Sequence, residues 1–122
     1  MNDKKNITNL VVKLNKMTQN GELNWSSHNS RLALNDQEET VDKIYRTSYK
    51  GKYFRLFKYR SRDYTDEGVF YWITGWRLEI TDENYNAEWT FPEERAVTDL
   101  YDSVRYQIVD VDDLLNELFS DE

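Results

Sequence analysis

Near the N-terminus, apolar residues recur every three or four positions. The recurring residues are Ile7, Leu10, Val11, Leu14 and Met17. This spacing places them on one face of an α-helix. Asn20 and Gly21 follow and supply a C-terminal stop. The pattern therefore predicts a helix over residues 4–19, and we expect Leu23 and Trp25 to fold back onto the core behind it.

The middle of the chain changes to the two-residue alternation of β-strands. Residues 43–49 and 52–60 are rich in Tyr, Phe, Ile and Thr, and Lys50–Gly51 between them suits a tight hairpin turn with glycine at positive φ. Residues 69–81 predict a long strand with one buried face. The apolar even positions that define this face are Phe70, Trp72, Trp76, Leu78 and Ile80. Gly75, in the middle of this strand, indicates a bulge or a close backbone approach.

Weaker patterns extend the predicted sheet. Residues 31–34 alternate and predict a short strand or irregular edge, which the polar loop 35–39 follows. Polar turns are expected at 63–68 and 82–86, and residues 87–91 form a last short strand that the single proline, Pro92, ends. Because the strands follow one another through short turns, we expect antiparallel pairing.

The C-terminal third returns to helical spacing. Pro92, Glu93 and Glu94 have the chemistry of a helix start, since proline fits the first turn and acids complement the positive end of the helix dipole. The next apolar face comprises Val97, Leu100, Tyr101, Val104 and Ile108. Asp110 is a candidate N-cap for a last helix, and both one kinked rod and two helices fit the pattern. The apolar face of this last helix comprises Val111, Leu114, Leu115 and Leu118.

These elements together predict an α+β fold. It comprises an N-terminal helix, an antiparallel meander sheet of four to five strands, and a C-terminal helix or helix pair packed on one sheet face. The 122 residues fit a single domain over 1–122. The absence of cysteine excludes disulfides and cysteine zinc sites. No apolar run approaches the roughly 20 residues of a membrane span, and the first residues lack the apolar region of a signal peptide, so we expect a cytoplasmic protein without membrane contact.

The formal net charge is −7, yet one segment is strongly basic. Residues 43–62 contain no acid and eight cations, which are Lys43, Arg46, Lys50, Lys52, Arg55, Lys58, Arg60 and Arg62. Six Tyr and Phe residues lie among them. Cations neutralise phosphates and exposed aromatic rings stack on bases, so this hairpin is a candidate site for single-stranded nucleic acid or a nucleotide. The residues predicted to bind are Arg55, Lys58, Tyr59 and Arg60.

A competing interpretation is that ion pairs neutralise this basic segment. Residues 79–122 contain fourteen acids and only two arginines, and pairs between elements are ordinary surface chemistry. Strand alternation also separates Arg55 and Tyr59 from Lys58 and Arg60. The acids themselves form a candidate partner-facing patch, because charge complementarity speeds association with a basic protein. Its predicted members are Asp99, Asp102, Asp112 and Asp113.

Catalytic and metal-binding patterns are not found. His28 is the only histidine, which disfavours histidine zinc sites and a Ser-His triad. The loop at 63–68 has the glycine of a calcium loop, but Thr74 stands where the twelfth-position glutamate is needed. Glu79 and Glu88 form only a loose carboxylate pair, on the outward phase of their strands. We therefore predict no catalytic residue, no metal site and no cofactor.

Two segments resemble a pattern of small uncharacterised single-domain bacterial and phage proteins. The first is Leu10-x-x-x-Leu14-x-x-Met17-Thr18-x-x-Gly21-x-Leu23-x-Trp25. The second is Leu100-Tyr101-x-x-Val104-Arg105-x-Gln107, followed by Val111-Asp112-x-Leu114-Leu115-x-x-Leu118. The resemblance implies a bacterial or phage origin and the α+β arrangement, and some such proteins are linked to defence, toxin immunity or phage counter-defence. It carries over no catalytic residue.

The leading hypothesis from the sequence is a non-enzymatic binding protein. It would be an interaction, immunity, inhibitor or defence-related module of bacterial or phage origin that recognises another protein through charged surface patches. The alternative is the binding of single-stranded nucleic acid or a nucleotide by the basic aromatic hairpin 43–62. The sequence leaves the oligomeric state open.

Overall fold

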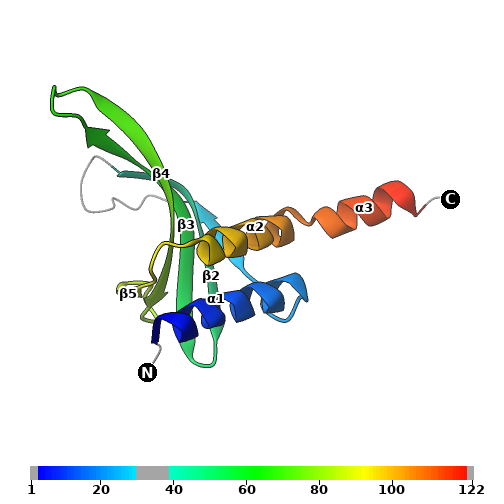
Figure 1. Ribbon diagram of the computed structural model, residues 1–122. Coiled ribbons are helices and arrows are strands. Elements are labelled where there is room, and N and C mark those ends of the chain that lie inside the picture. The colour runs from blue at the N-terminus through cyan, green and yellow to red at the C-terminus, as the bar shows by residue number, and fades with distance from the viewer. Residues whose placement is uncertain (1–2, 30–38, 121–122) are drawn as a thin grey trace.

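In the part of the chain that the structure describes, five antiparallel strands form one meander sheet, and two helices lie side by side on one of its faces (Figure 1). The computed structural model describes residues 3–29 and 39–120. The elements in chain order are α1 (Asp3–Gln19), β1 (Ser26–Asn29), β2 (Glu39–Tyr49), β3 (Lys52–Tyr64), β4 (Phe70–Thr81), β5 (Ala87–Thr90), α2 (Arg95–Val109) and α3 (Val111–Phe119). The strand order in the sheet is β1-β2-β3-β4-β5. The predicted α+β fold is thus confirmed.

The strand that the sequence does not predict is β1. Its four residues, Ser26–Asn29, are all polar, and they join the sheet by pairing with Lys43–Arg46 of β2. Hydrophobic alternation cannot detect a strand that backbone hydrogen bonds hold at a sheet edge. The strand or edge predicted at 31–34 lies outside the described residues. The Lys50–Gly51 turn has φ of 51° and 78°, as a primed hairpin turn requires.

The core lies between the sheet and the two helices. Its fully or nearly buried members are Val11, Leu14, Leu23, Trp25, Tyr45, Phe54, Leu56, Leu78, Phe91, Val97, Leu100 and Val104. We call this the helix-side face of the sheet. Alternation assigns the even residues of β3 and β4 to it and the odd residues to the opposite face.

Trp25 confirms the expected return of the chain after α1. Its indole Nε1 donates to Thr18 Oγ1 at 3.0 Å, and its backbone N donates to Gln107 Oε1 at 2.9 Å. The Gln107 amide in turn donates to the carbonyls of Thr18 and Leu23 at 3.2 and 2.8 Å. These buried or half-buried bonds join α1, the following loop and α2.

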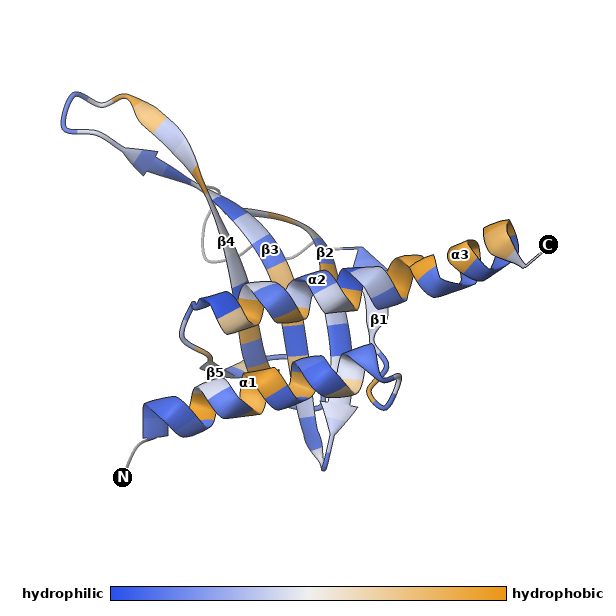
Figure 2. Cartoon of the chain, turned by 45° about the vertical axis from the view of Figure 1, so that its right-hand side comes forward, coloured by the Kyte–Doolittle hydropathy of each residue, from blue (hydrophilic) through white to orange (hydrophobic). Residues whose placement is uncertain are grey.

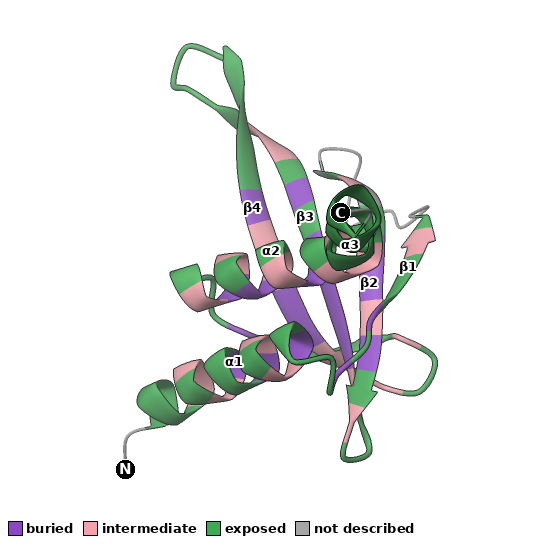
Figure 3. Ribbon diagram, turned by 90° about the vertical axis from the view of Figure 1, so that its right-hand side faces the viewer, coloured by how far each residue is buried: buried purple, intermediate pink, exposed green. Residues whose placement is uncertain are grey.

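The two C-terminal helices are separate, and Asp110 divides them. Asp110 adopts the left-handed conformation (φ 59°, ψ 52°), and its N–H bonds to the carbonyls of Gln107 and Tyr106. Its side chain makes no cap hydrogen bond to α3. Asp110 therefore occupies the predicted N-cap position of α3 without capping it through its side chain, and it also ends α2 because its N–H satisfies carbonyls of the last turn. None of the residues of α3 is buried (Figure 3), and the helix extends beyond the sheet (Figure 1).

The start of α2 also differs from expectation. The helix begins at Arg95, and Glu94 before it is extended without a side-chain cap hydrogen bond. Glu94 instead accepts the Thr8 hydroxyl of α1 at 2.8 Å. Glu93 accepts a hydrogen bond from the Tyr59 hydroxyl. The acids that were expected to complement the helix dipole therefore tie α2 to α1 and to the sheet.

β3 and β4 pair without interruption, from Tyr53 with Thr81 to Tyr64 with Phe70. This ladder continues past the helices as a two-stranded projection, residues 60–74, which we call the arm (Figure 1). Its large apolar side chains are between 38% and 63% exposed, and they are Tyr64, Val69, Phe70, Tyr71, Trp72 and Ile73. The prediction that Phe70 and Trp72 belong to a buried face is therefore wrong, because none of the three described helices covers the arm (Figures 1 and 3).

Gly75 lies where the arm joins the body. It pairs with Tyr59 without a register shift between β3 and β4, so it is not a bulge. A Cβ at this position would lie 2.4 Å from Tyr59 Cζ and Oη and 2.6 Å from Glu93 Oε1. The close approach that the sequence predicts is therefore made by two side chains instead of by backbone.

The substitution Gly75→Ala is expected to lower the free energy of unfolding by about 1–3 kcal/mol, since the added methyl group overlaps the Tyr59 ring. Urea unfolding followed by tryptophan fluorescence measures this change. Thr74→Ala, at the exposed neighbouring position, is the control and should cost less than about 1 kcal/mol. In the Tyr59→Ala background the cost of Gly75→Ala should shrink; an undiminished cost would show that the ring is not the obstacle.

Candidate binding surface

Four cations from three elements converge on one hollow of the helix-side face. The hollow has a volume of about 320 Å³ and is lined by Thr40 and Lys43 of β2, Lys58 and Arg60 of β3, and Tyr101 and Arg105 of α2. None of these described lining residues is acidic. We call it the cationic hollow. At a net charge of −7, such a gathering of positive charge makes a local anion-attracting site on a protein that repels anions at long range.

Aromatic rings of β4 contact the cations that β3 contributes to this surface. Lys58 Nζ lies 5.7 Å from the ring centre of Trp76, and Arg60 Cζ lies 4.7 Å from that of Trp72. Further along the arm, Arg62 Cζ lies 5.5 Å from the ring centre of Phe70. These cation–π contacts orient the cations without cancelling their charge. The helix-side face of the arm therefore continues the cationic hollow as a row of cations over exposed aromatic rings.

Arg105 reaches the hollow from α2 and is held in place. Its Nη1 donates to the Tyr45 hydroxyl at 3.2 Å, and this hydrogen bond is the main cause that raises the pKa of Arg105. Burial raises the pKa of the neighbouring Tyr101 phenol. The guanidinium stays charged and the phenol stays neutral at physiological pH, so both can donate to an anion.

The structure does not bring the four predicted binding residues together. Lys58 and Arg60 line the cationic hollow, whereas Arg55 and Tyr59 lie on the opposite sheet face and are buried. The Arg55 guanidinium forms an ion pair with Glu79, with Nε donating to Oε1 at 2.7 Å, and both side chains are only 6% exposed. Arg55 also donates to the Tyr85 carbonyl at 3.2 Å. The competing interpretation therefore applies to Arg55, which an acid of the C-terminal third neutralises.

Tyr59 is likewise engaged inside the protein. Its hydroxyl lies 2.8 and 2.9 Å from the two carboxylate oxygens of Glu93, and Arg77 Cζ lies over its ring, 4.3 Å from the ring centre. Burial, and next the hydrogen bond to Glu93, raise the pKa of the Tyr59 phenol. On this face Tyr59 packs with Ile44 and Phe57 in a second, smaller apolar cluster. Its position indicates a structural contact at the root of the arm.

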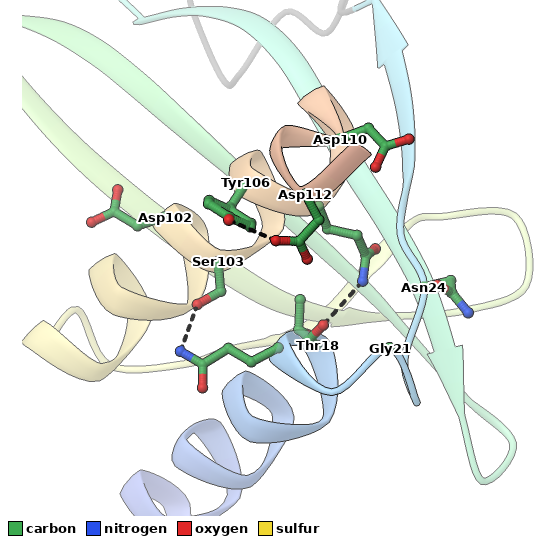
Figure 4. A pocket seen from close by; sticks show the side chains of 10 residues that line it. Thr18, Gly21, Asn24, Asp102, Ser103, Tyr106, Asp110 and Asp112 are labelled. Carbon is green, nitrogen blue, oxygen red and sulfur yellow. Dashed lines mark hydrogen bonds between the residues drawn. The ribbon is translucent and has the colours of Figure 1, made fainter. Parts of the chain in front are cut away.

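The predicted acidic patch is spread over α2 and α3. Asp99 is exposed and lies 4.0 Å from Arg95 Nε, one turn earlier, and Asp113 is exposed on α3. Asp102 and Asp112 line a second hollow, of about 470 Å³, where α1, α2 and α3 meet (Figure 4). In this second hollow, Asp112 accepts a hydrogen bond from the Tyr106 hydroxyl at 2.8 Å. Only two of the four predicted acids therefore share one concave surface.

The described residues contain no group of His, Asp and Glu side chains that could hold a metal ion. His28 bonds to the Ser26 hydroxyl at 2.9 Å, and burial, with Arg46 nearby, lowers its pKa. Glu79, which forms the loose carboxylate pair with Glu88 in the sequence analysis, instead forms a buried ion pair with Arg55. Within the described part of the chain, none of the helices is long and apolar enough to cross a membrane.

Comparison of the chain with protein-family models, with curated proteins and with solved structures gives no match. The resemblance to small bacterial and phage proteins therefore stays a prediction.

Sequence reasoning missed three contributors to this surface. Arg105 lies 45 residues after Arg60 in the chain, and only the packing of α2 on the sheet brings the two together. Phe70 and Trp72 were assigned to the core, although they line the exposed arm. The length of the predicted strand could have indicated that part of it is exposed. Its 13 residues over 69–81 extend further than a short C-terminal helix can cover.

Replacing Arg55 by methionine leaves the Glu79 carboxylate buried without its partner, so Arg55→Met is expected to cost about 3–5 kcal/mol of stability. Chemical denaturation measures the loss. The control is Arg95→Met in the exposed pair with Asp99, expected to change stability by less than about 1 kcal/mol. The double variant Arg55→Met with Glu79→Leu should recover most of the loss. If Arg55→Met were as stable as the wild type but lost affinity for anions, Arg55 would belong to the binding site after all.

The burial of the Tyr59 phenol, together with its hydrogen bond to Glu93, predicts a pH-dependent stability. The folded state raises the phenol pKa, so its contribution is complete below the ordinary tyrosine value of about 10 and is lost as the pH rises through the folded-state value. Compared with Tyr59→Phe, the wild type should be more stable by about 1 kcal/mol at neutral pH. Urea unfolding of both proteins at several pH values should show this gap narrowing above about pH 10. A gap that stays constant with pH would contradict the assignment.

Proposed function

We propose that this protein is a non-enzymatic binding protein that uses the cationic hollow and the helix-side face of the arm to hold an acidic protein segment. The observation that carries the proposal is the convergence of Lys43, Lys58, Arg60 and Arg105 on one hollow whose described lining includes no acid. Charge complementarity of this kind steers encounter and suppresses partners of the wrong charge.

The arm supplies the apolar part of the same surface. Trp72 and Phe70 are 45% and 46% exposed and carry Arg60 and Arg62 against their rings. Tryptophan and arginine are the residue types that dominate binding energy at protein interfaces, because they combine a large contact area with directed donors. An acidic and apolar segment would satisfy both components of this surface.

A second candidate function is the binding of a single-stranded nucleic acid or a nucleotide. The observation that favours it is the exposure of Trp72 and Phe70 directly beside the cations, since bases stack on such rings while cations contact the phosphates. This candidate keeps Lys58 and Arg60 of the predicted set and replaces Arg55 and Tyr59 by Arg62 and Trp72.

The proposal places the protein in the cytoplasm of a bacterial cell, where an immunity, inhibitor or defence-related role would suit a small module that recognises another protein. The resemblance of the two packing segments to small bacterial and phage proteins is what supports this setting.

Titration with two labelled probes, an oligoglutamate peptide and an oligothymidylate, tests the site and separates the two candidates. At about 50 mM salt, the double variant Lys58→Ala with Arg60→Ala should weaken binding of the preferred probe at least about tenfold, because two of the four cations of the hollow are lost. Fluorescence anisotropy measures the affinity. Quenching of Trp72 emission by oligothymidylate but not by oligoglutamate would favour the nucleic-acid candidate.

The matched control removes the same charge from α1. Lys13 and Lys16 are exposed and lie outside the hollow, so Lys13→Ala with Lys16→Ala should leave the affinity within about twofold of the wild type. If neither probe binds at this salt concentration, or if both double variants weaken binding equally, the proposed surface is wrong.

A further inference from the structure

The C-terminal helix α3 exposes an apolar stripe that the described part of its own chain leaves uncovered. Leu114, Leu115, Leu118 and Phe119 are between 43% and 68% exposed. Their spacing places them on one side of the helix, and Figure 2 shows apolar residues along α3. With nine residues, α3 is shorter than the roughly 12–15 that isolated helices need in water. A partner that covers this apolar stripe would therefore stabilise α3.

The charge of α3 restricts what this partner can be. Its described acids are Asp112, Asp113 and Glu117, and the chain contains no lysine or arginine after Arg105. Two copies of α3 packed against each other would bring these acids together, which is unfavourable. The surface that fits is apolar and positively charged. The helix-side face of the arm has both properties, with Phe70 and Trp72 exposed beside Arg60 and Arg62.

The sizes of the two elements agree, but their positions in one chain keep them apart. Nine helical residues span roughly 14 Å, and the paired segment from Arg60 to Tyr64 spans roughly 17 Å. Figures 1 and 2 both show the arm and α3 leaving the body in different directions. A second copy of the chain can supply the helix that the arm of the first copy lacks.

We propose that α3 of one copy docks on the helix-side face of the arm of a second copy, with its leucines on Phe70 and Trp72 and its acids facing Arg60 and Arg62. The contact is reciprocal, so each copy gives one helix and accepts one. Such an exchange closes as a two-fold dimer and does not propagate into fibres. This inference rests on the proposed function, because it takes the acidic protein segment bound by the cationic surface to be α3 itself.

A charge-swap experiment on the full chain tests this dimer. Variant one carries Asp113→Lys and Glu117→Lys on α3, and variant two carries Arg60→Glu and Arg62→Glu on the arm. Each variant alone places like charges at both contacts, so its dimer dissociation constant should rise at least about tenfold. Mixed in equal amounts they should form a heterodimer, because both contacts then pair opposite charges. Sedimentation velocity over a range of concentrations measures these masses.

A control variant reverses charge away from the proposed contact. Lys13→Glu with Lys16→Glu on α1 changes the net charge as much as the arm variant does, and its dimer should form as in the wild type. All substituted side chains are exposed or half-buried, and circular dichroism verifies that each variant is folded. Leu118→Ser should weaken the dimer without a change in charge.

The inference is overturned if the wild type stays monomeric at every concentration, or if the mixed variants do not associate. A monomer that still binds oligoglutamate in a manner dependent on Lys58 and Arg60 would overturn the dimer and leave the proposed function standing. A dimer that forms while neither probe binds would instead contradict the proposed role toward other partners. Displacement of dimers by oligothymidylate would show that nucleic acid competes for the same face.

Discussion

The uninterrupted ladder between β3 and β4 is the constraint on which the rest of the structure depends. Because side chains alternate strictly between the two faces, the register of Tyr53 with Thr81 determines the face of every residue out to the tip of the arm. The helices cover only the first part of this ladder, so the same strands form core at one end and a projection at the other. Gly75 stands at the transition, where the Tyr59 ring lies over the position that a Cβ would occupy.

The same alternation sorts the basic segment into two chemical environments. Arg55 lies on the opposite face and is neutralised by Glu79 in a buried pair. Lys58 and Arg60 lie on the helix-side face, where they meet Arg105 of α2. A buried ion pair desolvates two charges, which then neutralise each other, whereas cations over exposed aromatic rings keep their attraction for anions. One stretch of sequence therefore provides both a structural contact and a candidate binding surface.

The sequence predicts the elements that leave a local pattern of residues, and it misses the features that depend on contacts between distant segments. The repeat of Val97, Leu100 and Val104 predicts α2 because it records the burial of one helical face. The strand β1 escapes prediction because its residues are polar, and backbone pairing with β2 instead of a buried apolar face joins them to the sheet. Asp110 is of a residue type that often caps helix N-termini, but its backbone is left-handed and its N–H bonds to carbonyls in the last turn of α2. Trp72 alternates like a core residue, and alternation carries no information on whether a second layer covers it.

The sequence by itself determined the α+β class, the antiparallel hairpins, the helical faces and the existence of a basic aromatic segment, because these follow from periodicity and composition within short stretches of chain. The tertiary structure alone decided which cations meet. It placed Arg105 beside Lys58 and Arg60, paired Arg55 with Glu79 and Tyr59 with Glu93 on the face that alternation assigns to them, and left the arm and α3 without cover from the described residues. These outcomes depend on how far each helix extends over the sheet, a relation between distant segments that local pattern does not encode.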